Sequence, residues 1–137
     1  MEHIREYLTQ DALAAHLGME LVELSPGRAL VRMPVRPEHL NAVNVVHGGA
    51  SFALADFAFA AASNSHGTVA VALTASISYT RAGTGPELTA EATEISLGRK
   101  TATYLVTVRD AEGKTVALFQ GTVYRKSDVI PGGEQAG

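Results

Sequence analysis

The chain has 137 residues, the size of one ordinary domain, and 46% of them are hydrophobic. Its 14 acidic residues outnumber its 11 Lys and Arg, which argues against nucleic acid as a partner because phosphate binding calls for a basic surplus. It has no cysteine, so disulfides, thiolate metal sites and cysteine nucleophiles are excluded. We see neither a signal peptide nor an apolar run of the roughly 20 residues that cross a bilayer, so we expect a cytoplasmic protein without a membrane partner.

The hydrophobic spacing separates helices, with apolar residues three or four apart, from strands, with apolar residues two apart. Gly18, Pro26-Gly27, Gly83, Gly98 and Gly113 fall between these segments, as turn residues do. In chain order we predict a helix over 2–16, a hairpin of strands over 19–24 and 28–35, a loop over 37–48, a helix over 49–64, strands over 69–80, 87–93, 102–109 and 115–124, and a disordered tail over 127–137.

The predicted helix over 49–64 is apolar around nearly its whole circumference, so other elements must enclose it. Short turns join the four strands that follow, which predicts an antiparallel meander because parallel neighbours need a crossover. The sequence therefore predicts an α+β fold, with a curved antiparallel sheet wrapped around a long central helix in a single domain over 1–126.

Asp56 is the most informative residue, because it is an acid in the middle of this apolar helix. A carboxylate buried there is costly unless it is paired or hydrogen-bonded. One interpretation is structural: Asp56 has a partner on a surrounding strand or lies where a second subunit packs. The other is functional, because a carboxylate kept partly dry can act as a base or a nucleophile.

The start of the same helix carries His47-Gly48-Gly49. Two glycines let the backbone approach a ligand closely, and unpaired amides of a first helical turn stabilise a developing oxyanion. The same residues are also compatible with an ordinary turn and a structural histidine. Seven residues separate Gly49 from Asp56, about 10 Å along a helix, whereas attack on a bound carbonyl needs roughly 3 Å. If both groups serve one site, Asp56 must come from a second copy of the chain, so this hypothesis requires a dimer.

Other chemistry finds less support in the sequence. Gly49-Ala50-Ser51-Phe52-Ala53 lacks the last glycine of a nucleophile elbow, and no nucleotide-binding glycine motif is present. The five histidines have no metal-ligand spacing, so we predict no metal. Arg81, Arg99 and Lys100 are compatible with solvated surface charges or with contacts to a phosphate-bearing substrate.

The segments that identify a family are Leu40-Asn41, the run from His47-Gly48-Gly49 to Leu54-Ala55-Asp56, Ser63-Asn64, Gly98-Arg99-Lys100 and Gln120-Gly121. Together they resemble the PaaI-like acyl-CoA thioesterases of phenylacetate degradation, a branch of the hotdog-fold superfamily. The resemblance extends over about residues 17 to 126.

This resemblance implies a hotdog fold, a homodimer that pairs again into a homotetramer, and active sites between subunits. It implies that Asp56 is the catalytic carboxylate, that the Gly48 amide polarises the thioester carbonyl, and that His47 and Asn41 orient the thioester or its water. Gly49, Arg81, Arg99 and Lys100 are the expected substrate contacts. The implied substrate is of the phenylacetyl-CoA or hydroxyphenylacetyl-CoA type, while medium-chain fatty acyl groups remain open. Either substrate brings its own Coenzyme A, so no separate cofactor is expected.

Two other functions remain open at this point. A non-catalytic protein of the same fold could bind or sense acyl-CoA in the same pocket without turnover. A hotdog hydratase or dehydratase would need a histidine and an acid placed for proton transfer at carbon and at a hydroxyl. His47 precedes the helix rather than lying on it, which disfavours that reaction.

Overall fold

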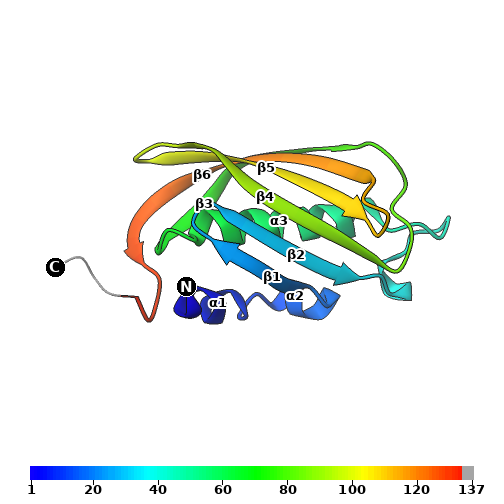
Figure 1. Cartoon of the computed structure of the whole chain (residues 1–137), viewed down its shortest axis with the longest axis horizontal. Helices are drawn as coiled ribbons and strands as arrows, with labels where there is room; N and C mark the ends of the chain where they lie inside the picture. Colours follow the sequence, from blue (N-terminus) through cyan, green and yellow to red (C-terminus); the bar gives the residue numbers. More distant parts are fainter. Residues whose placement is uncertain (134–137) are drawn as a thin grey trace.

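One antiparallel sheet curves around a single long helix, and the two shorter amino-terminal helices lie beside the sheet (Figure 1). This computed structural model describes residues 1–133. Its elements in chain order are α1 (Glu2–Leu8), α2 (Ala12–Leu17), β1 (Glu20–Ser25), β2 (Arg28–Pro34), the 3₁₀ helix η1 (Pro37–His39), α3 (Gly48–Asn64), β3 (Thr68–Tyr79), β4 (Glu87–Leu97), β5 (Thr101–Asp110) and β6 (Thr115–Val129).

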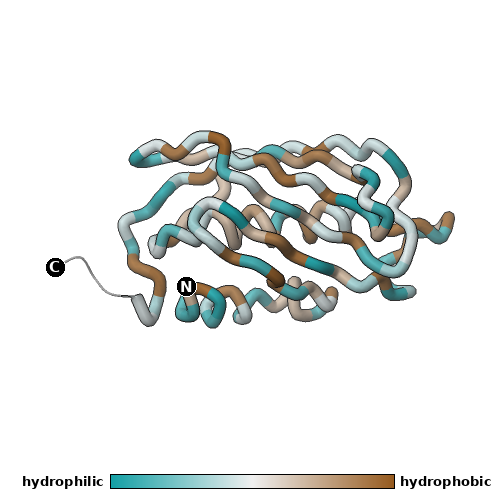
Figure 2. The backbone as a smooth tube through the Cα atoms, viewed as in Figure 1, coloured by the Kyte–Doolittle hydropathy of each residue, from teal (hydrophilic) through white to brown (hydrophobic). Residues whose placement is uncertain are grey.

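The strand order is β1-β2-β4-β5-β6-β3, with every pair antiparallel. The predicted hairpin and the α+β class are confirmed, and fully buried residues alternate with partly exposed ones along β2. Figure 2 shows hydrophobic and hydrophilic residues interspersed along the strands of the sheet. The four-strand meander is wrong for β3, which pairs with β6 at one edge while β4 pairs with β2. Periodicity identifies a strand but not its neighbours, so the sequence could not show that residues 80–86 carry the chain across to the far side of the sheet.

Helix α3 packs against the inner face of the sheet through small and aromatic side chains. The Phe59 ring lies 5.8 Å from Tyr104 and 5.4 Å from Phe119, and a Cβ on Gly121 would come within 2.6 Å of it. The prediction that α3 is enclosed holds except along one stripe, which carries Gly49, Phe52, Ala53, Asp56 and Ala60. None of the helices over residues 1–133 is both long and apolar enough to span a membrane.

The predicted helix over 2–16 is interrupted, because Asp11 starts a new helix. Its Oδ1 accepts a hydrogen bond from the Ala14 N–H at 2.9 Å and so caps α2, while the Thr9 hydroxyl donates to the Glu6 carbonyl at the end of α1 (2.6 Å). Helix α2 ends before Gly18, as predicted, and Gly18 has the left-handed φ of 77° typical of a helix end.

The prediction of a disordered tail over 127–137 is wrong for its first residues. Strand β6 continues to Val129, which pairs with Thr68, and Ile130 is fully buried with its N–H donating to the Gly67 carbonyl. This pairing with β3 and the burial of Ile130 hold the segment against the sheet, and the spacing of apolar residues did not reveal them. Residues 134–137 lie outside the described residues.

Candidate active site

The first turn of α3 leaves one backbone amide available to a ligand. The His47 ring caps the helix, with its Nδ1 accepting a hydrogen bond from the Gly49 N–H at 2.8 Å. The Gly48 N–H has no hydrogen-bond partner within residues 1–133. Amides at a helix N-terminus carry partial positive charge, so this N–H can donate to a developing oxyanion. The expectation of unpaired first-turn amides therefore holds for Gly48, whereas the Gly49 amide is already engaged by His47.

Tyr79 fixes the position of Gly48, and the sequence did not identify it. The Tyr79 hydroxyl donates to the Gly48 carbonyl at 2.8 Å, and a Cβ added to Gly48 would lie only 3.1 Å from the phenol ring. Position 48 thus has little room for any side chain. The two residues are 31 positions apart, and a tyrosine at the end of a predicted strand was the only signal in the sequence.

Asn41 belongs to the loop that leads into α3. Its Oδ1 accepts hydrogen bonds from the N–H groups of Val43 (3.0 Å) and Val45 (3.3 Å), which shapes the loop. The loop then folds back, because the His47 N–H donates to the His39 carbonyl at 2.8 Å. Asn41 and His47 therefore lie at the same end of α3, and the amide Nδ2 of Asn41 is the part of its side chain that remains for a ligand.

A hollow of about 310 Å³ lies beside Gly48, and Tyr79, Arg81 and Val116 also line it. Arg81 extends into a second, wider hollow that contains Lys114. Arg81 is thus near Gly48, as expected of a substrate contact, and Lys114 joins it as a second cation that sequence reasoning missed. The strand pairing explains this, because β6 begins beside the end of β3.

Arg99 and Lys100 lie at the opposite end of the sheet. The Arg125 N–H donates to the Lys100 carbonyl at 2.7 Å, and Arg125 pairs with Ala70 near the start of β3. Tyr79, which contacts Gly48, comes nine residues after Ala70 on the same strand, a separation of about 30 Å. Within one chain, Arg81 therefore lies far from Arg99 and Lys100, and the three expected substrate contacts do not form one site.

Asp56 lies on the open stripe of α3, in a small cleft between α2 and α3 that Asp11 and Ala53 also line. Within residues 1–133 its carboxylate has neither a hydrogen bond nor an ion pair. One side of it faces solvent, yet the surrounding protein removes enough water to raise the pKa of Asp56 above its usual value, and the charge of Asp11 raises this pKa further. Eight residues of helix separate it from Gly48, about 12 Å along the axis.

Comparison with known proteins places this arrangement in a family. The thioesterase superfamily model matches residues 43–117, the segment that contains both Gly48 and Asp56. The chain belongs to the thioesterase superfamily. It is 41% identical over 123 residues to the acyl-coenzyme A thioesterase PaaI of Escherichia coli, an alignment that covers 89% of this chain and 88% of that protein.

Solved structures agree with this thioesterase assignment. The structure of the E. coli PaaI protein from the phenylacetic acid degradation operon superposes with a TM-score of 0.89 at 36% identity, covering 93% of this chain and 94% of that one. A mutant form of the phenylacetic acid degradation protein PaaI from Thermus thermophilus is 48% identical, with a TM-score of 0.80 and coverage of 85% and 100%. The predicted hotdog fold and the PaaI-like resemblance are thereby confirmed, and the chain is a thioester hydrolase.

Proposed function

We propose that this thioesterase hydrolyses acyl-CoA thioesters, of the phenylacetyl-CoA or hydroxyphenylacetyl-CoA type, to the free acid and Coenzyme A. The proposal rests on two groups that one chain holds apart and that have complementary roles in thioester hydrolysis. These are the available Gly48 N–H beside a hollow and the unpaired Asp56 carboxylate, whose pKa is raised. The name of the E. coli relative supports the substrate class.

The proposed site requires two chains arranged as a homodimer. Strand β3 is a sheet edge with exposed Val71 and Leu73, and the open stripe of α3 lies beside it. An unpaired apolar edge strand is a template for pairing with another copy. Antiparallel pairing of two β3 strands places the Tyr79 and Gly48 end of one chain beside the start of β3 in the other. It also turns the two α3 helices in opposite directions, so that Asp56 of one chain can approach Gly48 of the other.

The same pairing accounts for the remaining expected contacts. It puts Arg99 and Lys100 of the second copy at the end of the joint sheet that carries Arg81, where all three can contact the phosphates of Coenzyme A. The exposed Leu105, Leu118 and Tyr124 on the outer face of the sheet support further pairing of dimers into the proposed homotetramer.

In the proposed reaction, the Gly48 N–H donates to the thioester carbonyl oxygen and stabilises the charge that develops on it. Asp56 of the second chain then acts in one of two ways. As a base, it takes a proton from a water molecule that attacks the carbonyl carbon; as a nucleophile, it attacks that carbon itself and forms a mixed anhydride, which water later hydrolyses. In both routes the carbon–sulfur bond breaks and Coenzyme A leaves as the thiolate. His47 and Asn41 orient the thioester or the water, and neither route calls for a metal or a further cofactor.

Release of free thiol from a panel of arylacetyl-, benzoyl- and straight-chain acyl-CoA thioesters tests this proposal. We expect turnover by the wild type and a loss of about 10²-fold or more in Asp56→Asn. Glu23→Gln is the control, because this exposed acid lies on β1, at the edge of the sheet opposite to β3. Failure of the wild type to release thiol from any thioester would contradict the proposal, and a thioester that stays bound for hours would instead indicate the binding or sensor function.

A further inference from the structure

Ser51, in the first turn and a half of α3, has a hydroxyl that the protein itself does not use. The polar residues that lie buried within residues 1–133 are His39, Ser51, Ser63, Asn64 and Ser65. The other four each form a side-chain hydrogen bond. Ser51 is only 2% exposed, and its hydroxyl forms none with the described residues, although it lines the hollow beside Gly48. This hydroxyl is therefore open to a group placed in the hollow.

The carbonyls that a helical serine normally bonds to are already engaged around Ser51. A serine inside a helix usually donates to the carbonyl three or four residues before it. For Ser51 these are the carbonyls of Gly48 and His47. The Gly48 carbonyl accepts from the Tyr79 hydroxyl at 2.8 Å, and the His47 carbonyl accepts from two backbone N–H groups. These contacts explain why the Ser51 hydroxyl remains free.

The Ser51 hydroxyl and the Gly48 N–H serve the same space. Both residues line the hollow of about 310 Å³ at the start of α3. They are three residues apart, which places them about 60° from each other around the helix and about 4.5 Å apart along its axis. Helical side chains tilt toward the N-terminus, so the Ser51 hydroxyl lies closer to the level of Gly48 than this rise suggests. Two hydrogen-bond donors can therefore meet one small group of atoms.

Ser51 lies on the side of α3 that faces away from the open stripe. Five residues separate it from Asp56, or about 140° around the helix. The hollow beside Ser51 is formed within one chain, by α3, the end of β3, the connection that follows it and the start of β6. In the proposed dimer, Asp56 of the second copy approaches a carbonyl at Gly48 from the stripe side, while Ser51 faces it from the other.

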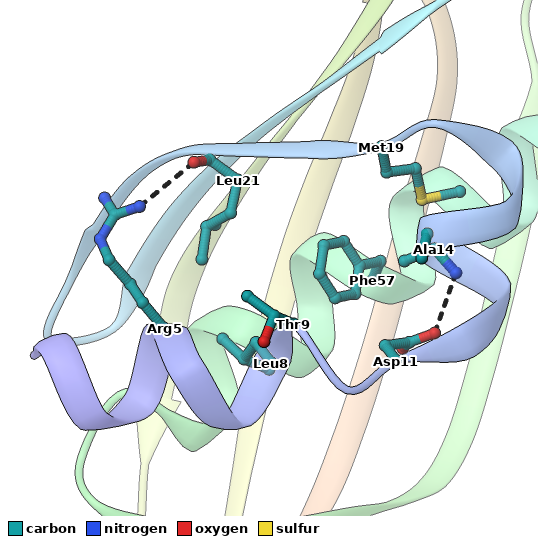
Figure 3. A pocket seen from close by; sticks show the side chains of 9 residues that line it. Arg5, Leu8, Thr9, Asp11, Ala14, Met19, Leu21 and Phe57 are labelled. Carbon is teal, nitrogen blue, oxygen red and sulfur yellow. Dashed lines mark hydrogen bonds between the residues drawn. The ribbon is translucent and has the colours of Figure 1, made fainter.

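The cavity between the amino-terminal helices and α3 offers no such pair of free groups. It has a volume of about 190 Å³, and Phe57 forms part of a largely apolar wall. Figure 3 shows that Arg5 in this wall bonds to the Leu21 carbonyl, at 3.2 Å. Asp11 accepts from the Ala14 N–H at 2.9 Å and so caps α2. These polar side chains hold the fold together, whereas those at the start of α3 are available to a ligand.

We propose that the Ser51 hydroxyl donates a hydrogen bond to the thioester sulfur and stabilises the departing thiolate. This inference rests on the proposed hydrolysis of acyl-CoA, and it adds a donor for the leaving group. The sulfur and the carbonyl oxygen of a thioester are bonded to the same carbon. A carbonyl oxygen at the Gly48 N–H therefore puts the sulfur within reach of a donor less than one helical turn away. Arg81, which lines both this hollow and the wider one beyond, then lies on the Coenzyme A side.

Ser51 keeps its proton in this reaction. The carbon–sulfur bond breaks with its electron pair on sulfur, and the acyl carbon retains the oxygen that water or Asp56 has supplied. The thiolate accepts the hydrogen bond from Ser51 as its charge develops, and it takes a proton from solvent after release. Within residues 1–133 no histidine or carboxylate bonds to the Ser51 hydroxyl, so nothing there activates it as a nucleophile.

Two phenylacetyl thioesters with different leaving groups test this assignment. The thiolate of N-acetylcysteamine is strongly basic, like that of Coenzyme A, whereas 4-nitrothiophenolate leaves readily without a hydrogen bond. We expect Ser51→Ala to lower kcat/KM about tenfold or more for the N-acetylcysteamine thioester and for phenylacetyl-CoA. The loss for the 4-nitrothiophenyl thioester should be less than about threefold. Ser51→Cys, which keeps a weaker donor, should lie between Ser51→Ala and the wild type.

Ser63→Ala is the matched control. Ser63 is another buried serine of α3, but its hydroxyl donates to the Ala60 carbonyl at 3.2 Å, so its loss should leave the ratio between the two thioesters unchanged. Equal losses for both thioesters in Ser51→Ala would indicate a structural role and overturn the inference, as would full activity of this variant. A wild type that releases no thiol from any thioester would contradict the proposed function, and the inference with it.

Discussion

The two ends of the proposed catalytic apparatus are held in very different ways. At the start of α3, His47 caps the Gly49 amide, Tyr79 bonds to the Gly48 carbonyl, and the loop is tied back through the His39 carbonyl. Eight residues later, Asp56 has no hydrogen-bond partner within residues 1–133, and burial raises its pKa. This difference between a fixed amide and an unpaired carboxylate in the same helix supports the proposal that one chain supplies only half of the site.

The largest effect is expected at Gly48, in the firmly held first turn of α3. Gly48→Ala puts a Cβ about 3.1 Å from the Tyr79 ring, so the first turn or the tyrosine must move. A displacement of this kind at a reacting group costs about 10²-fold in kcat. Thiol-release kinetics measure it, and wild-type kcat in Gly48→Ala would show that the Gly48 amide does not act on the carbonyl. Ala42→Gly, an exposed change in the preceding loop, is the control.

A smaller effect is expected from replacing the cationic side chains of Arg81 and Lys100. Arg81→Gln should raise KM about tenfold with kcat little changed, since Arg81 lines the hollow beside Gly48. Lys100→Gln should raise KM less, about threefold, because a lysine meets a phosphate as a single point charge, whereas an arginine can bind it through two N–H groups. The difference should shrink at high salt. Equal effects at both positions would contradict the ranking.

The smallest effect is expected from Asp11, the charged neighbour of Asp56. The pKa of Asp56 is raised mainly by burial and additionally by the charge of Asp11. Asp11→Asn removes that charge and keeps a capping side chain, so the pKa of Asp56 falls and the acidic limb of kcat/KM moves to lower pH. A pH–rate profile that moves the other way, or does not move, would show that Asp56 is not the group that titrates.

Much of this fold could be predicted because its signals are local. The apolar run of α3 and the alternation in β2 and β3 show in any short window of the sequence. The break at Asp11, the continuation of β6 to Val129 and the place of β3 at the edge could not be predicted, because each depends on a capping or pairing partner that spacing does not reveal.

The residues of the candidate site show the same difference between local signals and contacts that depend on the fold. Gly48 and Asp56 stand out in the sequence because a glycine pair precedes a helix and an acid interrupts its apolar run. Tyr79 does not, since its contact with Gly48 comes from the fold. Likewise, only strand pairing shows that Lys114 lies with Arg81 and that Lys100 does not.

Subunit complementation tests the central claim most directly. Gly48→Pro removes the amide donor, and Asp56→Asn removes the carboxylate, so each variant alone should be inactive as an intact oligomer. If the groups act across two chains, mixing the unfolded variants equally and refolding them should restore about a quarter of the wild-type activity, because half of the dimers are hybrids with one complete site. A mixture no more active than its components, with hybrid dimers present, would show that both groups act within one chain and would contradict the account.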